Sequence, residues 1–159
     1  IDLSKGATIF VVGQYESDLD RGGILRVENA SGGSLLEIYG DTLFSGTYNP
    51  YVVANRATGR TFVPTTRVWD IDKDQIITAS MVDTNPGVWR DRTLNASTID
   101  GSGSLHPANG FDTAFLGWGF AKNSSNFAFR ALVIYDGELT QEQREEVWDI
   151  LNSRYRGLF

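Results

Sequence analysis

The residues best suited to chemistry in this chain are aromatic side chains with polar neighbours, and the chemistry they favour is sugar binding. Trp89 lies in the segment VWRDR, where Arg90 and Asp91 follow the ring directly. Such a ring stacks on the apolar face of a sugar, while Asp, Asn or Arg side chains bind its hydroxyl groups. The same hypothesis covers three further aromatic residues beside an acidic turn or an Asn-Pro pair, namely Trp69, Tyr48 and Tyr51. The alternative for each ring is packing in the core or at the rim of the fold.

A short acidic segment offers a second kind of chemistry, the binding of calcium. Asp70, Asp72 and Asp74 stand at alternate positions, as carboxylates do at the start of a calcium loop. However, Gln75 stands where that loop needs glycine, and Met81 stands where it needs glutamate. We therefore predict a solvated turn and no cofactor, with a calcium ion as the alternative.

The sequence lacks the usual combinations of catalytic residues. It has no cysteine and a single histidine, His106. These are too few residues to form a zinc site or a Ser-His or Cys-His nucleophile. Glycoside hydrolysis needs two converging carboxylates. Glu16 and Asp18 fall where a strand runs out into a turn, while Glu28 and Glu37 are isolated on their strands. We therefore predict that the protein is not an enzyme. A glycan hydrolase or lyase with carboxylates from distant strands is the alternative.

Composition indicates one soluble domain over residues 1–159. A chain of 159 residues with 41% hydrophobic and 12% aromatic residues can bury one sizeable core, and its 17 glycines suit a fold with many turns. The net charge of −6 without a basic run argues against nucleic acid or an anionic membrane as partner. Apolar stretches are too short to predict membrane insertion. Because the chain opens on Ile1 rather than Met, we expect a mature piece or one domain of a longer protein.

Short apolar runs recur between turn signals along most of the chain. Many short strands with one terminal helix predict a two-sheet sandwich. The polar, Gly- and Ser-rich segment Asn95–Gly110 predicts a long irregular surface loop. The predicted strands are Ala7–Gln14, Gly23–Glu28, Leu35–Tyr39, Tyr51–Asn55, Arg60–Val68, Gln75–Val82, Val88–Thr93, Ala114–Phe120 and Phe127–Tyr135.

The last predicted strand is apolar on both faces, so it needs cover on two sides. On one face we place Phe127, Phe129, Ala131, Val133 and Tyr135, and on the other Ala128, Arg130, Leu132 and Ile134. The helix that follows supplies the second cover. Thr140 is the expected N-cap, and Gln143 completes a capping box. The expected apolar stripe and C-cap are Val147, Ile150, Leu151 and Tyr155, then Gly157, with Trp148 as a further core residue.

Two segments carry a family resemblance. The run FRALVIYDGELTQEQREEVWDILNSRYRG resembles the end of laminin-G-like, concanavalin-A-like jelly rolls, where a strand ending in Tyr-Asp leads through a Leu-Ser/Thr-x-x-Glu/Gln-Arg turn into a final helix. The run ATIFVVGQYES resembles the first core strand of the same family. The middle matches by strand rhythm only, and PGVWRDRTLNAS replaces the usual Tyr-x-Asn-Gly-like hairpin. The resemblance implies an all-β, two-sheet antiparallel jelly-roll sandwich (concanavalin A-like) with a C-terminal α-helix packed on it.

The same resemblance implies a role in recognition. Such domains bind glycans and are often attached to larger extracellular or virion proteins, including bacteriophage fibres. We therefore predict a non-catalytic, lectin-like domain on an extracellular or virion surface, whose partner is a cell-surface glycan or another virion or surface protein. A homo-oligomer would form through the parent protein. The alternative is a structural virion decoration or assembly domain without a small ligand.

Overall fold

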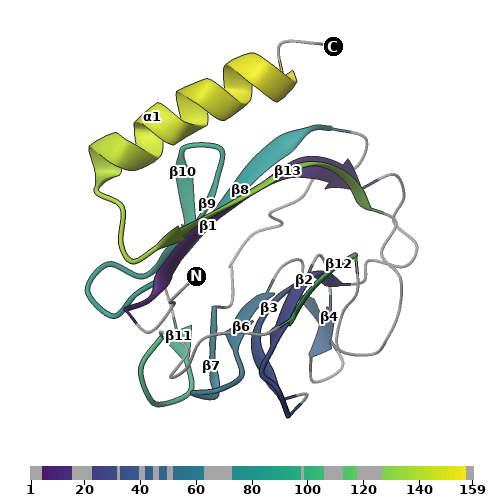
Figure 1. Ribbon diagram of the computed structural model, residues 1–159, viewed down its shortest axis with the longest axis vertical. Helices are drawn as coiled ribbons and strands as arrows, with labels where there is room; N and C mark the ends of the chain where they lie inside the picture. Colours follow the sequence, from purple (N-terminus) through teal and green to yellow (C-terminus); the bar gives the residue numbers. More distant parts are fainter. Residues whose placement is uncertain are drawn as a thin grey trace.

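Two antiparallel sheets and one helix form three layers in the computed structural model. It describes residues 5–15, 23–31, 33–39, 42–44, 47–49, 52–62, 73–97, 99–105, 113–117 and 127–156. Figure 1 shows the helix α1 above a five-stranded sheet, with a six-stranded sheet beneath. The predicted all-β, two-sheet jelly-roll sandwich with a C-terminal helix packed on it is confirmed.

Strands distant in sequence are neighbours in both sheets. Among the described residues, the five-stranded sheet has the order β10 (Thr93–Ala96), β9 (Gly87–Arg90), β8 (Gln75–Met81), β1 (Ala7–Tyr15) and β13 (Phe127–Asp136). The six-stranded sheet has the order β11 (Ile99–Asp100), β7 (Arg60–Phe62), β6 (Val52–Asn55), β3 (Ser34–Tyr39), β2 (Gly23–Glu28) and β12 (Thr113–Leu116). A separate hairpin, which the sequence did not indicate, joins β4 (Thr42–Phe44) and β5 (Thr47–Asn49).

Strand β1 is buried on both faces because it lies in the middle layer. Ile9 and Val11 belong to the core between the two sheets. Phe10 and Val12 belong to a second cluster, between the five-stranded sheet and α1. Each such side chain contributes about 1.5–3 kcal/mol when it is fully removed from water. A strand in the middle layer therefore needs a continuous run of apolar residues, and not apolar residues that alternate with polar ones.

Strand β13 departs from the strict alternation predicted for it. Its pairing with β1 shifts just before Gly13, so that Arg130 is the extra residue of a β-bulge. Phe129 and Leu132 consequently pack against the same core between the sheets, and the prediction that they face opposite sides is wrong. A side chain is excluded at Gly13, because a Cβ there would lie 2.4 Å from the carbonyl oxygen of Ala128.

The helix α1 (Gln141–Leu151) begins with the predicted capping box. The Thr140 hydroxyl accepts a hydrogen bond from the Gln143 backbone, and the Gln143 side chain accepts one from the Thr140 backbone. The chain continues as a π-helical turn, η1 (Asn152–Arg156), and the predicted C-cap Gly157 lies outside the described residues. No helix in the described part of the chain is long and apolar enough to span a bilayer.

The buried stripe of α1 is rotated relative to the predicted one. Ile150 is 56% exposed, so its assignment to the apolar face is wrong. Trp148 is buried, as predicted, and Arg144 is buried beside it, which turns Ile150 towards solvent. Burial lowers the pKa of Arg144, an effect that Glu138 and Glu145 oppose. The other predicted stripe residues pack against the cluster beneath the helix, namely Val147, Leu151 and Tyr155.

The capping box provides a direct test of this helix. Thr140→Ala is expected to lower the free energy of unfolding by about 1 kcal/mol, because an N–H at the helix start loses its acceptor. Urea unfolding followed by circular dichroism measures the change. Gln141→Ala, one residue further along the exposed face, is the control and should stay within about 0.5 kcal/mol of the parent. Equal losses in both variants would show that the cap contributes nothing specific.

Each predicted strand begins within one residue of an observed strand, but the segment Val88–Thr93 is divided differently. The sequence predicts one strand over Val88–Thr93, whereas the chain reverses at Asp91 and Arg92 between β9 and β10. Asp91 has a φ of 52°, in the left-handed region that few non-glycine residues occupy. Pattern alone does not reveal such a turn, because Asp-Arg lacks the usual glycine.

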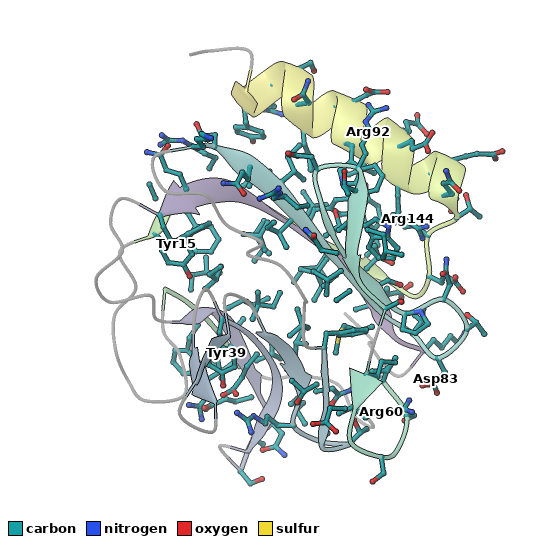
Figure 2. All side chains as sticks on the ribbon, turned by 180° about the vertical axis from the view of Figure 1, so that it is seen from behind. Tyr15, Tyr39, Arg60, Asp83, Arg92 and Arg144 are labelled. Atoms are coloured by element: carbon teal, nitrogen blue, oxygen red, sulfur yellow. The ribbon has the colours of Figure 1, made fainter. Side chains whose placement is uncertain are left out.

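The segment Asn95–Gly110, predicted as an irregular surface loop, contains regular structure and a buried core residue in its described part, residues 95–97 and 99–105. It contains the end of β10, the short strand β11, and the core residue Leu105. The backbone N–H of Leu105 donates to Asp83 Oδ1 at 2.8 Å, and Arg60 Nη1 lies 3.3 Å from the same oxygen. Figure 2 shows Arg60 and Asp83 at one side of the sandwich. Since Asp83 follows β8 and Arg60 lies on β7, this contact joins the two sheets.

Candidate functional site

The face of the six-stranded sheet turned away from α1 carries charged and aromatic side chains. Phe115 on β12, Arg26 on β2 and Glu37 on β3 are successive cross-strand partners. Because side chains alternate along a strand and Leu25 and Leu36 belong to the inner core, Arg26 and Glu37 face outward. We define the outer-face cluster as Arg26, Glu28, Glu37, Tyr39, Arg56 and Phe115.

Glu37 is the centre of the outer-face cluster. Its side chain is 0% exposed. Glu37 Oε2 accepts hydrogen bonds from Arg56 Nε at 2.9 Å and from the Tyr39 hydroxyl. Arg56 Nη2 also donates to the Tyr39 hydroxyl, at 3.3 Å. On the other side, Glu37 Oε1 lies 3.5 Å from Arg26 Nε. Two guanidinium groups and one phenol therefore hold the carboxylate in a single orientation.

The two arginines connect the buried carboxylate to solvent. The side chains of Arg26 and Arg56 are 17% and 38% exposed. Arg26 Nη2 also pairs with Glu28 Oε1 at 2.5 Å. A buried ion pair adds little net stability but fixes geometry, and a guanidinium presents several N–H donors in a rigid plane. The cluster thus offers oriented donors next to the half-buried ring of Phe115.

Two polar atoms inside the cluster are not hydrogen bonded. Glu37 Oε1 and Arg26 Nε are both buried and have no hydrogen-bond partner within the described structure. Their 3.5 Å separation satisfies an ion pair only. Most buried polar atoms in folded proteins are hydrogen bonded, so exceptions gather at functional positions or at bound water. Arg60 Nε and Asp74 Oδ1, in two other ion pairs, are alike in this respect, so the geometry of the cluster and not these atoms alone sets it apart.

Of the residues predicted from the sequence as ligand-binding, the three whose side chains the structure describes lie outside the outer-face cluster. Trp89, Arg90 and Asp91 belong to β9 and the turn that follows, in the five-stranded sheet. Tyr48 lies on β5, with its side chain outside the described part. Trp69 and Tyr51 lie outside the described residues altogether. For these three aromatic residues the hypothesis stays a prediction.

Trp89 lies beneath α1 and not at the open surface. Its side chain is 8% exposed and belongs to the cluster that also holds Phe10 and Trp148. The guanidinium of Arg144 lies 4.5 Å from the centre of the Trp89 ring. Gly87 makes room for the ring, since a Cβ at that position would lie 2.6 Å from its edge. These contacts bury the Trp89 ring. Trp89 therefore has the packing role that was the alternative to sugar binding.

The acidic segment contributes one carboxylate to the described structure. Asp70 and Asp72, the first residues of the calcium hypothesis, lie outside the described residues. The carboxylate oxygen Oδ1 of Asp74 lies 3.4 Å from Arg130 Nε, and the side chain is nearly buried. Within the described ranges, no three His, Cys, Asp or Glu side chains are grouped to hold a metal ion.

Comparison with known proteins identifies the fold of this chain. It does not show a family to which the chain belongs. No protein-family model and no curated protein sequence matches the chain. A sialidase of Trypanosoma rangeli shares 15% identity at a TM-score of 0.64, over 98% of this chain and 24% of the sialidase. A Bacteroides ovatus protein proposed to bind carbohydrate shares 14% identity at a TM-score of 0.62, over 92% of this chain and 41% of its own. This chain therefore spans less than half the length of either protein, and their similarity to it is one of fold.

Sequence reasoning treated Glu28 and Glu37 as isolated and overlooked Arg26 and Arg56. One signal was available, because Arg26 in GILRVE and Glu37 in SLLEIY each stand between two apolar neighbours. Two such strands joined by a short turn pair with each other, which sets opposite charges directly across the sheet. The contribution of Arg56 carries no comparable signal, since it comes from the turn after β6.

Proposed function

We propose that this chain is a non-catalytic recognition domain that binds a glycan through the outer-face cluster. The observation that carries the proposal is the buried Glu37, which fixes Arg26 and Arg56 in place. Sugar sites combine a few polar groups of fixed orientation with an aromatic surface. Here the guanidinium groups would donate to hydroxyl or carboxylate oxygens of the glycan, and Phe115 would contact its apolar face.

The comparisons support the class of ligand without identifying it. The Bacteroides ovatus protein is proposed to bind carbohydrate. The Trypanosoma rangeli sialidase is known in complex with sialic acid. Because the identities are 14–15%, these likenesses support a glycan only together with the outer-face cluster.

The burial and the contacts of the carboxylates support binding without catalysis. A glycosidase needs a protonated carboxyl group at the glycosidic oxygen and a second carboxylate on the opposite side of the sugar. Glu37 is fully buried, and Glu28 and Glu37 both lie against Arg26. A buried Glu37 cannot reach a glycosidic oxygen, and both carboxylates are already paired with guanidinium groups of the cluster.

The finer assignment within this proposal is a laminin-G-like domain. It rests on the C-terminal strand and helix, whose junction has the Leu-Thr-x-x-Gln-Arg sequence of the resemblance and forms a capping box. The setting we propose is a larger extracellular or virion-surface protein, with a cell-surface glycan as the partner and oligomers formed through the parent protein.

A glycan array tests the proposal directly. The domain is expected to bind a defined set of glycans, and Arg56→Ala should weaken that binding by about 10- to 100-fold, the equivalent of one charge-assisted hydrogen bond. Arg154→Ala, which removes the same charge from an exposed position in η1, is the matched control and should bind like the parent. Binding that survives both Arg56→Ala and Arg26→Ala would rule out the outer-face cluster. Repeating the array with calcium and with a chelator tests the Asp70–Asp74 hypothesis.

A structural role without a small ligand is the second candidate. Leu94 on β10 and Leu116 on β12 are large, exposed apolar side chains. Both strands end their sheets among the described residues, and edge strands readily pair with other chains. A blank array together with concentration-dependent self-association in light scattering would favour this role.

A further inference from the structure

We propose a second ligand site, for a single neutral sugar ring, at the seam between α1 and the β9–β10 hairpin. It lies on the other side of the sandwich from the outer-face cluster, and its existence does not depend on that cluster. A pocket of about 290 Å³ opens there. Figure 2 shows Arg92 at this seam, next to the helix. We call it the seam pocket, lined by Ile76, Asp91, Arg92, Thr93, Trp148 and Asn152.

Asp91 gives the seam pocket a rigid polar wall. Its backbone N–H donates to the Ile76 carbonyl at 2.7 Å, and its Oδ1 accepts from the Ile76 N–H at 3.2 Å. These two bonds hold the residue at a φ of 52°. Residues held in uncommon backbone conformations occur more often at binding sites than elsewhere. The carboxylate is thus fixed at the pocket wall before any ligand arrives.

Arg92 gives the pocket a movable donor. Its guanidinium pairs with Asp149 of α1, and the two side chains are 53% and 69% exposed. An ion pair this exposed holds its partners weakly. Arg92 is therefore able to turn from Asp149 to a ligand at little cost. Thr93 and Asn152, both exposed, add a hydroxyl and an amide at the rim.

The closed floor of the pocket is formed by Ile76 and Trp148, which reach it only at their edges because they are 2% and 3% exposed. Both side chains are buried in the cluster beneath α1. The Trp148 indole is held by a hydrogen bond from Nε1 to Thr78 Oγ1 at 2.7 Å. Carboxylate, amide, hydroxyl and guanidinium groups around this closed floor suit a ring whose hydroxyls both donate and accept.

Size and charge narrow the ligand further. A volume near 290 Å³ is at the lower limit for small-molecule pockets, about 300–1,000 Å³, which favours one sugar ring over a chain. Among the described lining residues, one carboxylate, Asp91, balances one cation, Arg92, and Asp149 outside the lining already pairs with that cation. The local charge therefore does not favour an acidic sugar and leaves a neutral monosaccharide as the expected occupant.

The test is a ¹H–¹⁵N NMR titration of the whole chain with monosaccharides. Methyl mannoside and methyl galactoside serve as neutral probes, and N-acetylneuraminic acid serves as the acidic probe. We expect one neutral probe to shift the Trp148 indole and the amides of Asp91, Arg92 and Thr93 with a saturable curve. The acidic probe should leave these signals in place.

Two variants remove polar groups of the rim without touching the buried floor. Thr93→Val and Asn152→Ala are each expected to weaken binding at least fivefold. Asn85→Ala, at an exposed turn away from the pocket, is the matched control and should bind like the parent.

Three outcomes would overturn the proposal. Shifts confined to Arg26, Glu37 and their neighbours would leave the outer-face site standing and remove the seam pocket. Saturable shifts from the acidic probe alone would contradict a neutral ligand. The seam pocket would also be excluded by shifts that do not saturate, or by shifts that persist unchanged in both rim variants. In that case a loss of array binding in Arg56→Ala would still be separate evidence for the outer-face cluster.

Discussion

Trp148→Ala is expected to lower the free energy of unfolding by about 3–5 kcal/mol, the usual cost of truncating a large aromatic residue in a core. Trp148 is a central contact between α1 and the sheet. Its ring packs edge-to-face against Phe10, with centroids 6.3 Å apart. Its indole N–H donates to Thr78, a fully buried residue of β8. Truncation removes the ring contact and the hydrogen bond at once, and it leaves a cavity between the layers.

Urea unfolding monitored by far-ultraviolet circular dichroism measures this loss, and two variants separate its parts. Trp148→Phe keeps most of the apolar area and removes only the indole donor, so about 1–2 kcal/mol is expected from the hydroxyl of Thr78 left buried. Ile150→Ala, two residues along the same helix, changes an exposed side chain and should cost no more than about 0.5 kcal/mol. Comparable losses for Trp148→Ala and Ile150→Ala would show that the helix does not depend on this contact.

The C-terminal helix was predictable because its start is encoded locally. The Thr140–Gln143 box needs only residues three apart, and the structure has both of its hydrogen bonds. The apolar stripe was less predictable, since a sequence pattern assigns Arg144 to the polar face. In the folded chain Arg144 donates to the Leu139 carbonyl and covers Trp89, so it replaces Ile150 at the buried surface. Whether an arginine is buried depends on its contacts in the folded protein, and the periodicity of a helix sequence does not predict these contacts.

Strand β13 shows the same limit in another form. Its apolar character predicted correctly that both faces would be covered, and they are. The bulge at Arg130 reverses the facing of the residues before it. It arises at Gly13 of the partner strand, more than 100 positions away in sequence. The residue pattern of one strand does not show which residue of another strand pairs with it. The bulge could therefore not be predicted from the sequence.

The candidate site was hidden for a related reason. Aromatic residues with polar neighbours were sensible candidates, but an isolated sequence does not distinguish a Trp on the surface from one under a helix. Trp89 is of the second kind. The outer-face cluster instead combines residues that are separately ordinary, and only the pairing of β2 with β3 makes Arg26 and Glu37 neighbours.

Glu37→Ala is expected to lower the free energy of unfolding by about 3 kcal/mol, at the lower end of the cost of removing one partner from a buried ion pair. Without the carboxylate, the Tyr39 hydroxyl and Arg56 Nε lose their shared acceptor. The loss stays at that lower end because Arg56 is partly exposed and water can hydrate its guanidinium. Glu28→Gln is the control, since Glu28 pairs with the same Arg26 from a more exposed position, and about 0–1 kcal/mol is expected there. Equal effects at the two glutamates would contradict a special role for Glu37.

The same position also distinguishes orientation from simple stability. Glu37→Gln keeps the size of the side chain and one carbonyl acceptor but cannot pair with two guanidinium groups. If Glu37 acts by orienting Arg26 and Arg56, this variant should lose glycan binding at temperatures well below its unfolding transition. A purely structural glutamate would instead give a folded Glu37→Gln protein that binds like the parent. Binding and unfolding measured on one preparation separate the two cases, because the arginines that would touch the ligand are unchanged and only their support has been altered.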